Sequence, residues 1–263
     1  HTTLHLLYSR FWNLFLYAQG LVPVKEPYRN RHPHGIVLAA DGEKMSKSRG
    51  NVVNPDEIVS NFGADTLRMY EMFLGPHEMS VSWNDQGILG ISRFLNRVWK
   101  LIAEGTAERQ GENAVAHKTI KKVGEDIENF RYNTAVSAMM IFLNDLESNG
   151  ASAFDKQVLV KLLAPFAPHI AEELWQILNP KAEGSIHQEK WPEYDSKLCE
   201  EKTFNLIIQV NGKTRANVEM AAGATEEEAG AKALAEEKVK VAIAGADSKR
   251  IVYVPGRLIN IVI

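Results

Sequence analysis

The chain has 263 residues, of which 45% are hydrophobic and 24% are charged, and its net charge is −3 at pH 7. This composition is ordinary for a globular protein of two or three modules, and a protein that held nucleic acid mainly by its net charge would be more basic. The single cysteine, Cys199, excludes an internal disulfide and fits a reducing cytoplasm. No apolar run reaches membrane-spanning length, and the first residues do not resemble a signal peptide.

The beginning of the chain predicts a helix, a loop and a short strand. Apolar residues at helical spacing predict a helix over residues 4–18, which Gly20 ends. Three prolines make residues 23–33 a loop. Ile36-Val37-Leu38 is a candidate buried strand that leads into the basic string Lys44-Met45-Ser46-Lys47-Ser48. The string therefore follows the end of a strand, where open α/β sheets bind their ligands.

The middle of the chain predicts a helical bundle. Asn54-Pro55-Asp56-Glu57 is a strong helix start, and Asp65 is predicted to cap a second helix that stops at Gly75-Pro76. From Gln86 onward, apolar stripes at helical spacing predict further helices, at 88–102, 120–130, 136–146 and 170–178. The Met and Trp residues in these stripes are predicted to pack in the core.

The end of the chain predicts a small α/β module after a polar linker at residues 181–203. Two hairpins are expected, one around Asn211-Gly212 with strands 204–210 and 214–220, the other around Pro255-Gly256 with strands 250–254 and 258–263. Thr225 and Glu228 predict a capping box that opens one helix between the hairpins. From Cys199 onward nine Lys and Arg residues balance nine Asp and Glu residues, so the module has no net basic surface.

The basic string has the chemistry of a phosphate-binding loop. Lys44 and Lys47 supply point charges, while Ser hydroxyls and backbone N–H groups supply hydrogen-bond donors for a polyphosphate. A generic turn rich in Lys and Ser would instead be a solvated polar loop. Gly212-Lys213-Thr214 invites a second phosphate-loop interpretation, which fails because Ile207 occupies the earlier glycine position and the segment joins two strands.

Several motifs together resemble the leucyl-tRNA synthetase family of the bacterial type, in class I of the aminoacyl-tRNA synthetases. They are the leading string His1-x-x-x-His5-Leu6-Leu7-Tyr8, the basic string 44–48, Gly63-Ala64-Asp65-Thr66-Leu67-Arg68, Pro165–Trp175, Gln209–Arg215 and the ending Val254–Val262. The basic string by itself would admit the isoleucyl, valyl and methionyl relatives. The leading helix and the final module narrow the resemblance to leucine.

The chain also departs from the family pattern. The signature His-x-Gly-His is absent, and His32-Pro33-His34-Gly35 has the wrong order and lies in a proline loop. The first half of the nucleotide-binding fold and the editing domain are missing, and only Ala39–Glu43 stands where a further insert often precedes the basic string. We therefore expect a C-terminal fragment that is inactive by itself.

The resemblance implies a mixed, mainly α fold in four parts. Residues 1–53 would end a Rossmann-like α/β catalytic domain, and residues 54–85 would form a connecting helical region that contacts the tRNA stem. Residues 86–198 would be an anticodon-binding-type helical bundle with its linker, and residues 199–263 a small α/β C-terminal tRNA-binding module of two hairpins and a helix.

The resemblance also implies a function, the ATP-dependent ligation of leucine to tRNA(Leu) through leucyl-adenylate. Lys44 and Lys47 would be catalytic, and the ATP-binding residues would be Val37, Leu38, Lys44, Met45, Ser46, Lys47 and Ser48. ATP would bring Mg²⁺, with no metal site within this chain. We expect a cytoplasmic monomer with tRNA(Leu) as its partner and no membrane contact.

Two further assignments leave alternatives open. His1 and His5 share a helix face, and the resemblance implies that they line the leucine pocket together with Tyr8. The alternatives are that they are ordinary core or surface histidines, or that they bind a metal ion as a pair. The missing Glu of a His-Glu-x-x-His motif disfavours the metal pair. The resemblance implies that Lys213 and Arg215 contact the tRNA elbow; the alternative is that they only lie on a solvated hairpin edge. The alternatives for the whole chain are a tRNA-binding module without catalysis, a fragment of an isoleucyl, valyl or methionyl relative, or an unrelated helical scaffold.

Overall fold

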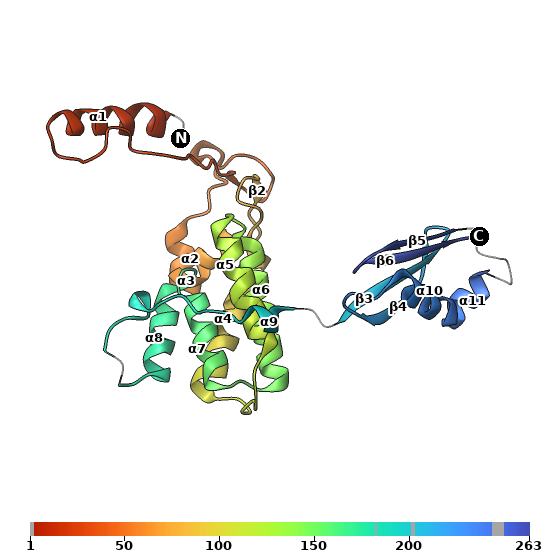
Figure 1. The fold of residues 1–263 in the computed structure, drawn as a ribbon. Coiled ribbons are helices and arrows are strands. Elements are labelled where there is room, and N and C mark those ends of the chain that lie inside the picture. Colours follow the sequence, from red (N-terminus) through yellow and green to blue (C-terminus); the bar gives the residue numbers. More distant parts are fainter. Residues whose placement is uncertain (1–2, 182, 201–202, 244–249) are drawn as a thin grey trace. The chain divides into compact units, whose positions relative to one another are not determined.

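The computed structural model describes residues 3–181, 183–200, 203–243 and 250–263 (Figure 1). The chain divides into two compact units, His1–Glu193 and Tyr194–Ile263. In the part of the chain that is described, no helix is both long and apolar enough to cross a membrane.

The first unit begins with the predicted helix. Its first turns, Leu4–Ser9, are wound as a π-helix (η1) and continue into α1, Arg10–Ala18. Its apolar side chains lie in solvent, with Phe11 68% and Trp12 60% exposed. The chain then folds back along the helix, where Asn13 donates to the carbonyls of Val24 and Lys25.

A two-stranded parallel sheet follows. Strand β1, Val37–Leu38, pairs with β2, Val81–Ser82, so that Val37 lies opposite Val81. The predicted strand is thus confirmed, although its side chains are half-buried rather than buried. The basic string follows β1 and includes a 3₁₀ turn, Lys47–Arg49 (η2).

Seven α-helices, shown from orange to teal in Figure 1, account for most of the first unit's core. They are α2 (Pro55–Phe62), α3 (Ala64–Phe73), α4 (Asp85–Trp99, extended by η3, Lys100–Glu104), α5 (Ala114–Glu128), α6 (Tyr132–Asn149), α7 (Ala153–Leu163) and α8 (Pro168–Leu178). A short 3₁₀ turn, η4 (Ile186–Gln188), follows them. The helix starts follow local chemistry, since the side chains of Asn54, Asn84 and Asn113 each accept a backbone N–H of the first turn.

The sequence does not predict α7, and it extends α5 too far. Val158, Leu159, Val160, Leu162 and Leu163 of α7 are all buried, so the helix has hardly any polar face to create a period. The prediction that the helix continues to Phe130 is wrong, because α5 ends at Glu128 and Phe130 has a positive φ of 56°.

Asp65 does not cap its own helix, contrary to the prediction. Gly63 is the N-cap of α3, and the carboxylate of Asp65 reaches the start of α8. There Asp65 Oδ2 accepts the N–H of Ile170 at 2.7 Å, and Oδ1 pairs with His169 Nδ1 at 2.8 Å. Since Ala167, the N-cap of α8, has no side-chain acceptor, Asp65 supplies the missing cap from another helix.

Removing this cap is expected to destabilise the first unit. Asp65→Ala would leave two backbone N–H groups at the start of α8 without their acceptor, which costs about 1–3 kcal/mol of unfolding free energy. Urea denaturation of the chain measures the loss. Asp56→Ala is the control, because Asp56 is an exposed acid in the first turn of α2 and its charge contributes only about 0.3–1 kcal/mol. Equal losses in the two variants would contradict the role of Asp65.

Glu172 fastens the chain after α8. Its carboxylate accepts the hydroxyl of Ser185 at 2.6 Å and the N–H of Ile186 at 3.0 Å. The hydrogen bond from Ser185, followed by the one from Gln176, lowers the pKa of Glu172. This part of the Pro165–Trp175 motif therefore has a structural explanation.

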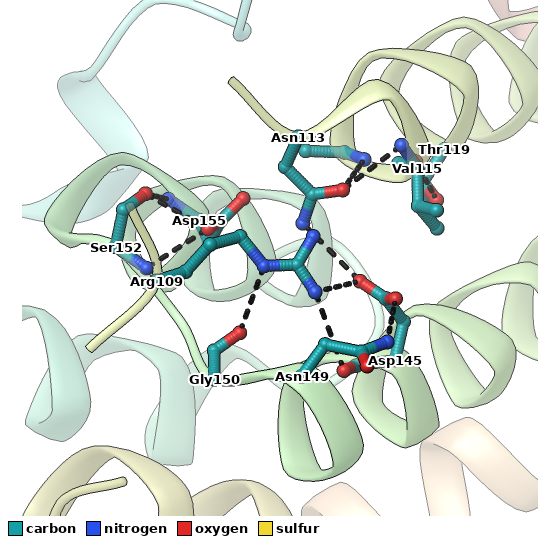
Figure 2. Close-up of polar contacts among 10 residues, drawn as sticks. Arg109, Asn113, Val115, Thr119, Asp145, Asn149, Gly150, Ser152 and Asp155 are labelled. Atoms are coloured by element: carbon teal, nitrogen blue, oxygen red, sulfur yellow. Dashed lines mark hydrogen bonds and ion pairs between the residues drawn. The ribbon is translucent and has the colours of Figure 1, made fainter. Parts of the chain in front are cut away.

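A polar clip joins the loop before α5 to the end of α6 (Figure 2). Arg109 donates from Nε to the carbonyl of Gly150 at 3.1 Å and from Nη2 to Asp145 Oδ2 at 2.8 Å. Asn113 donates to the same carboxylate while its side-chain oxygen caps α5. Because Arg109 and Asp145 are both nearly buried, the clip sets where α5 starts against α6.

The second unit is the predicted small α/β module. It starts with a short helix, α9 (Ser196–Cys199). Its sheet has the order β4-β3-β6-β5, from the strands Thr203–Val210 (β3), Lys213–Ala221 (β4), Arg250–Val254 (β5) and Leu258–Val262 (β6). Both predicted hairpins are confirmed, and the parallel pair β3–β6 joins them.

The single helix predicted between the hairpins is two helices. Thr225 and Glu228 form the predicted capping box of α10, Glu226–Ala235. The extended backbone of Glu236 then separates α10 from α11, Glu237–Ile243. Both helices contribute to the core, where Ala229, Ala233 and Val239 pack with the buried side chains of the sheet.

Candidate functional site

The basic string is a folded turn at the end of β1. Lys44 forms a β-bridge with Leu38, and the N–H of Ala39 donates to the carbonyl of Glu43 at 2.8 Å. Asn51 accepts the N–H of Ser46 at 2.8 Å, and Arg49 pairs with Glu43 at 2.9 Å. The bridge and the two bonds from backbone N–H groups hold the string in this turn, whereas the Arg49–Glu43 pair is exposed at its surface.

Both lysines of the string are exposed, whereas Met45 between them packs against the core of the first unit. Within the described residues, neither Lys44 nor Lys47 forms an ion pair with a carboxylate. The hydroxyls of Ser46 and Ser48 are 2.8 Å apart. The turn thus presents two cations and a pair of hydroxyls to solvent, which suits an anionic ligand.

A cavity of about 570 Å³ lies beside Lys44, and we call it the His5–Lys44 cavity. Its lining consists of His5, Tyr28, residues 30–34, Ile36 and Lys44. The ring of His5 meets Tyr28 edge-on at 5.9 Å, and the Tyr28 hydroxyl donates to Ser9 Oγ at 2.9 Å. The cavity therefore forms where the proline loop returns to the helix that carries His5.

The other residues predicted for the site lie outside this cavity. Tyr8 is 58% exposed, and Leu38 and Lys47 are not among the lining side chains. Val37 lines a second cavity of about 340 Å³ between β1 and α3. His1 lies outside the described residues.

Ionisable groups on α1, in the loop after it and at the second cavity have shifted pKa values. At α1, the hydrogen bond with Glu26 at 2.8 Å raises the pKa of Arg10 and lowers that of Glu26. In the second cavity, burial raises the pKa of Glu71, and the charge of Arg68 opposes this effect.

Lys213 and Arg215 are exposed at the start of β4. The turn before them is held by β6, since the N–H of Gly212 donates to Asn260 Oδ1 at 3.0 Å and the N–H of Ile263 donates to Asn211 Oδ1 at 3.2 Å. Arg215 lines a pocket of about 380 Å³ with Thr214 and α11 residues Glu237, Lys238 and Val241. The two cations therefore stand on a rigid hairpin.

Two family models match the chain. The model "tRNA synthetases class I (I, L, M and V)" matches residues 8–84, and the model "Anticodon-binding domain of tRNA ligase" matches residues 113–229. The leucine–tRNA ligase of Alkaliphilus oremlandii (strain OhILAs) is 46% identical over 270 residues, an alignment that covers all of this chain and 33% of that protein. The chain belongs to the leucyl-tRNA synthetase family, as part of its C-terminal region.

A solved structure agrees with this assignment. It is a LeuRS of Agrobacterium radiobacter K84 in a ternary complex with tRNA and LeuAMS, 34% identical, with a TM-score of 0.73 over all of this chain and 37% of that one. The chain thus spans about a third of the length of both relatives. The expected fold class is confirmed: the end of a class I catalytic domain, an anticodon-binding helical domain and a small C-terminal sheet.

The sequence reasoning missed several residues that line the His5–Lys44 cavity, namely Tyr28, Asn30, Arg31 and His32. The available signal was a run of aromatic and basic residues in an otherwise irregular proline loop.

Proposed function

We propose that the whole protein ligates leucine to tRNA(Leu) with ATP through leucyl-adenylate, and that this region supplies the phosphate-binding loop and tRNA-binding surfaces. One observation carries the proposal. Lys44 and Lys47 lie exposed on a turn beside a cavity, in a chain that is similar over its full length to a leucine–tRNA ligase. Within the described residues, neither lysine pairs with a carboxylate.

The first reaction needs charge stabilisation rather than a covalent enzyme intermediate. The leucine carboxylate attacks the α-phosphorus of ATP, the bond to the bridging oxygen breaks, and pyrophosphate leaves with the electron pair. Negative charge grows on the leaving phosphates, which Lys44 and Lys47 are suited to neutralise. Ser46 and Ser48 would donate to phosphate oxygens, and the backbone at Val37, Leu38 and Met45 would lie beside the nucleotide.

We assign the leucine pocket to the His5 side of the His5–Lys44 cavity. His5 and Tyr28 meet there at 5.9 Å, and Lys44 reaches the same space. Tyr8 and His1 belong to the same proposal by the family resemblance. ATP would arrive with Mg²⁺ on its phosphates; among the described residues no three His, Cys, Asp or Glu side chains gather to hold a metal ion.

The tRNA would contact the bundle and the C-terminal module. The Agrobacterium relative was crystallised with tRNA, and residues 113–229 match an anticodon-binding domain. Lys213 and Arg215 would contribute by their placement, since the module has no net charge to attract RNA. We further propose a monomer that works in the cytoplasm.

A double substitution separates the two reactions. In the full-length protein, Lys213→Ala with Arg215→Ala is expected to weaken leucyl-tRNA formation while leaving leucine-dependent ATP–pyrophosphate exchange unchanged, because exchange needs no tRNA. Both rates are measured on the same preparation. The matched control is Lys232→Ala, since Lys232 lies on α10 and already donates to the carbonyl of Glu219. Absence of exchange in the unmodified protein would refute the ligase assignment, and equal losses of both reactions would refute the tRNA role.

The second candidate is a tRNA-binding module without catalysis. The match of residues 113–229 to an anticodon-binding domain favours it for this stretch of chain taken alone. The two proposals are compatible, because one concerns the whole protein and the other this region by itself.

A further inference from the structure

The corner between α5 and α6 has a strained residue with an aromatic contact. Phe130 has φ +56°, in the left-handed region that non-glycine residues rarely adopt. Its ring stacks on His32 at a centroid distance of 4.4 Å and an interplanar angle of 26°. Strain of this kind costs about 1–3 kcal/mol and persists only where the surroundings enforce it.

A buried carboxylate enforces the corner. Asp126 is fully buried, and its Oδ2 accepts the hydroxyl of Thr134 at 2.7 Å and pairs with Lys122. Its Oδ1 lies 3.0 Å from Arg131 Nε, and its backbone carbonyl accepts the N–H of Arg131 at 2.7 Å. Asp126 thus ties the end of α5 to Arg131 and Thr134, which follow Phe130.

Two further rings complete what we call the corner cluster: His32, His77, Phe130 and Tyr132. His77 lies 5.4 Å from Phe130 and 5.9 Å from Tyr132, and Tyr132 meets Phe166 of the core at 6.5 Å. The cluster therefore connects the bundle core to two separate segments, the proline loop and the turn before β2.

The supported segments lead directly to the basic string. His32 lines the His5–Lys44 cavity. The N–H of Gly35 donates to the carbonyl of His77 at 2.8 Å, and β1 begins two residues later. Since Leu38 of β1 bridges to Lys44, one continuous set of contacts joins Phe130 to the cavity wall and to the string.

We propose that Phe130 is a positioning residue for amino-acid activation. Its ring holds His32, and with it the wall of the His5–Lys44 cavity, at the distance from Lys44 that the reaction requires. The bundle thereby takes part in activation although it contributes no side chain to the cavity. The inference rests on the proposed function.

The test uses Phe130→Gly in the full-length protein, because glycine removes the ring and relieves the strain together. A shift of about 1 Å at a reacting group lowers rates by about 100-fold, so we expect kcat for leucine-dependent ATP–pyrophosphate exchange to fall by about 10- to 100-fold. The melting temperature and the Kd for tRNA should stay close to those of the unmodified protein. Phe130→Tyr keeps the ring and should show the exchange rate of the unmodified protein.

Phe154→Ala is the matched control. Phe154 also stacks on a histidine, His117, at 5.4 Å, but it lies on α7, is 44% exposed, and neither ring lines the His5–Lys44 cavity. Phe154→Ala should leave ATP–pyrophosphate exchange unchanged. If Phe130→Gly does not fold, Phe130→Leu, which keeps apolar volume without a ring, takes its place with the same expected loss.

Three results would overturn the proposal. They are an exchange rate in Phe130→Gly within about twofold of the unmodified protein, equal losses of exchange and of tRNA binding, and failure of Phe130→Tyr to restore the rate. If the unmodified protein shows no exchange, the proposed function fails instead. Amide hydrogen exchange then tests the inference. Phe130→Gly should speed the exchange of amide hydrogens across residues 32–45, and unchanged protection of these amides would refute the inference.

Discussion

Replacing Lys47 with alanine in the full-length protein is expected to slow leucine-dependent ATP–pyrophosphate exchange by about 30- to 1000-fold. This range corresponds to about 2–4 kcal/mol of activation free energy, the usual loss when one preorganised stabiliser of a transition state is removed. Lys47 is exposed and makes no ion pair with the described part of the chain, so the fold should not change. The loss should appear mainly in kcat, because the charge is most useful as pyrophosphate leaves.

Arg49→Ala is the control for this experiment. Arg49 lies in the same 3₁₀ turn, but its guanidinium already pairs with Glu43 at 2.9 Å. Its removal should therefore slow exchange much less than removal of Lys47. Equal effects would mean that the turn needs its local structure rather than the charge of Lys47, and an unchanged rate in Lys47→Ala would refute the catalytic role.

Gly35→Ala is expected to have the second large effect. Gly35 lies so close to the turn before β2 that an added methyl group would overlap the carbonyl of Met79 and lie 2.7 Å from the N of Ser80. Both neighbours are backbone, so the segment itself must move away by about 1 Å or more. We expect the hydrogen bond from Gly35 to His77 to break and exchange to fall by about 100-fold, as for other misplacements of this size.

Gly90→Ala is the matched control for Gly35→Ala. Gly90 lies within α4, and an added methyl group would meet nothing within 4 Å. This substitution should stabilise the protein by about 0.5–1 kcal/mol, because alanine is the better helix former. Exchange kinetics and urea denaturation are measured on both variants. If Gly35→Ala behaves like Gly90→Ala, the close packing at Gly35 does not position the basic string.

Local signals in the sequence were sufficient for many elements of this protein. The cap at Asn54, the capping box of Thr225 with Glu228 and the hairpin at Asn211-Gly212 form as predicted. Each of these groups bonds to backbone only two or three residues away or sets its own turn, so the information lies within a short window. The basic string is equally local, because its lysines and serines are consecutive.

Other features depend on partners far along the chain. The sequence predicts that Asp65 caps its own helix, yet its carboxylate oxygens accept N–H groups of residues 104 and 105 positions later. The sequence shows no helical period for α7, because neighbouring elements bury this helix on nearly every side. Phe130 looked like the end of an apolar stripe, and only the buried Asp126 beside it explains the turn.

The sequence by itself therefore determined the family resemblance, the basic string and most helices and hairpins. Only the tertiary structure decided which residues lie around that string. The cavity beside Lys44 forms because the proline loop folds back so that Tyr28 meets His5, and its wall is held by Phe130 from a helix corner about a hundred residues later. Contacts of this kind have no period or motif, since they arise from packing between distant segments.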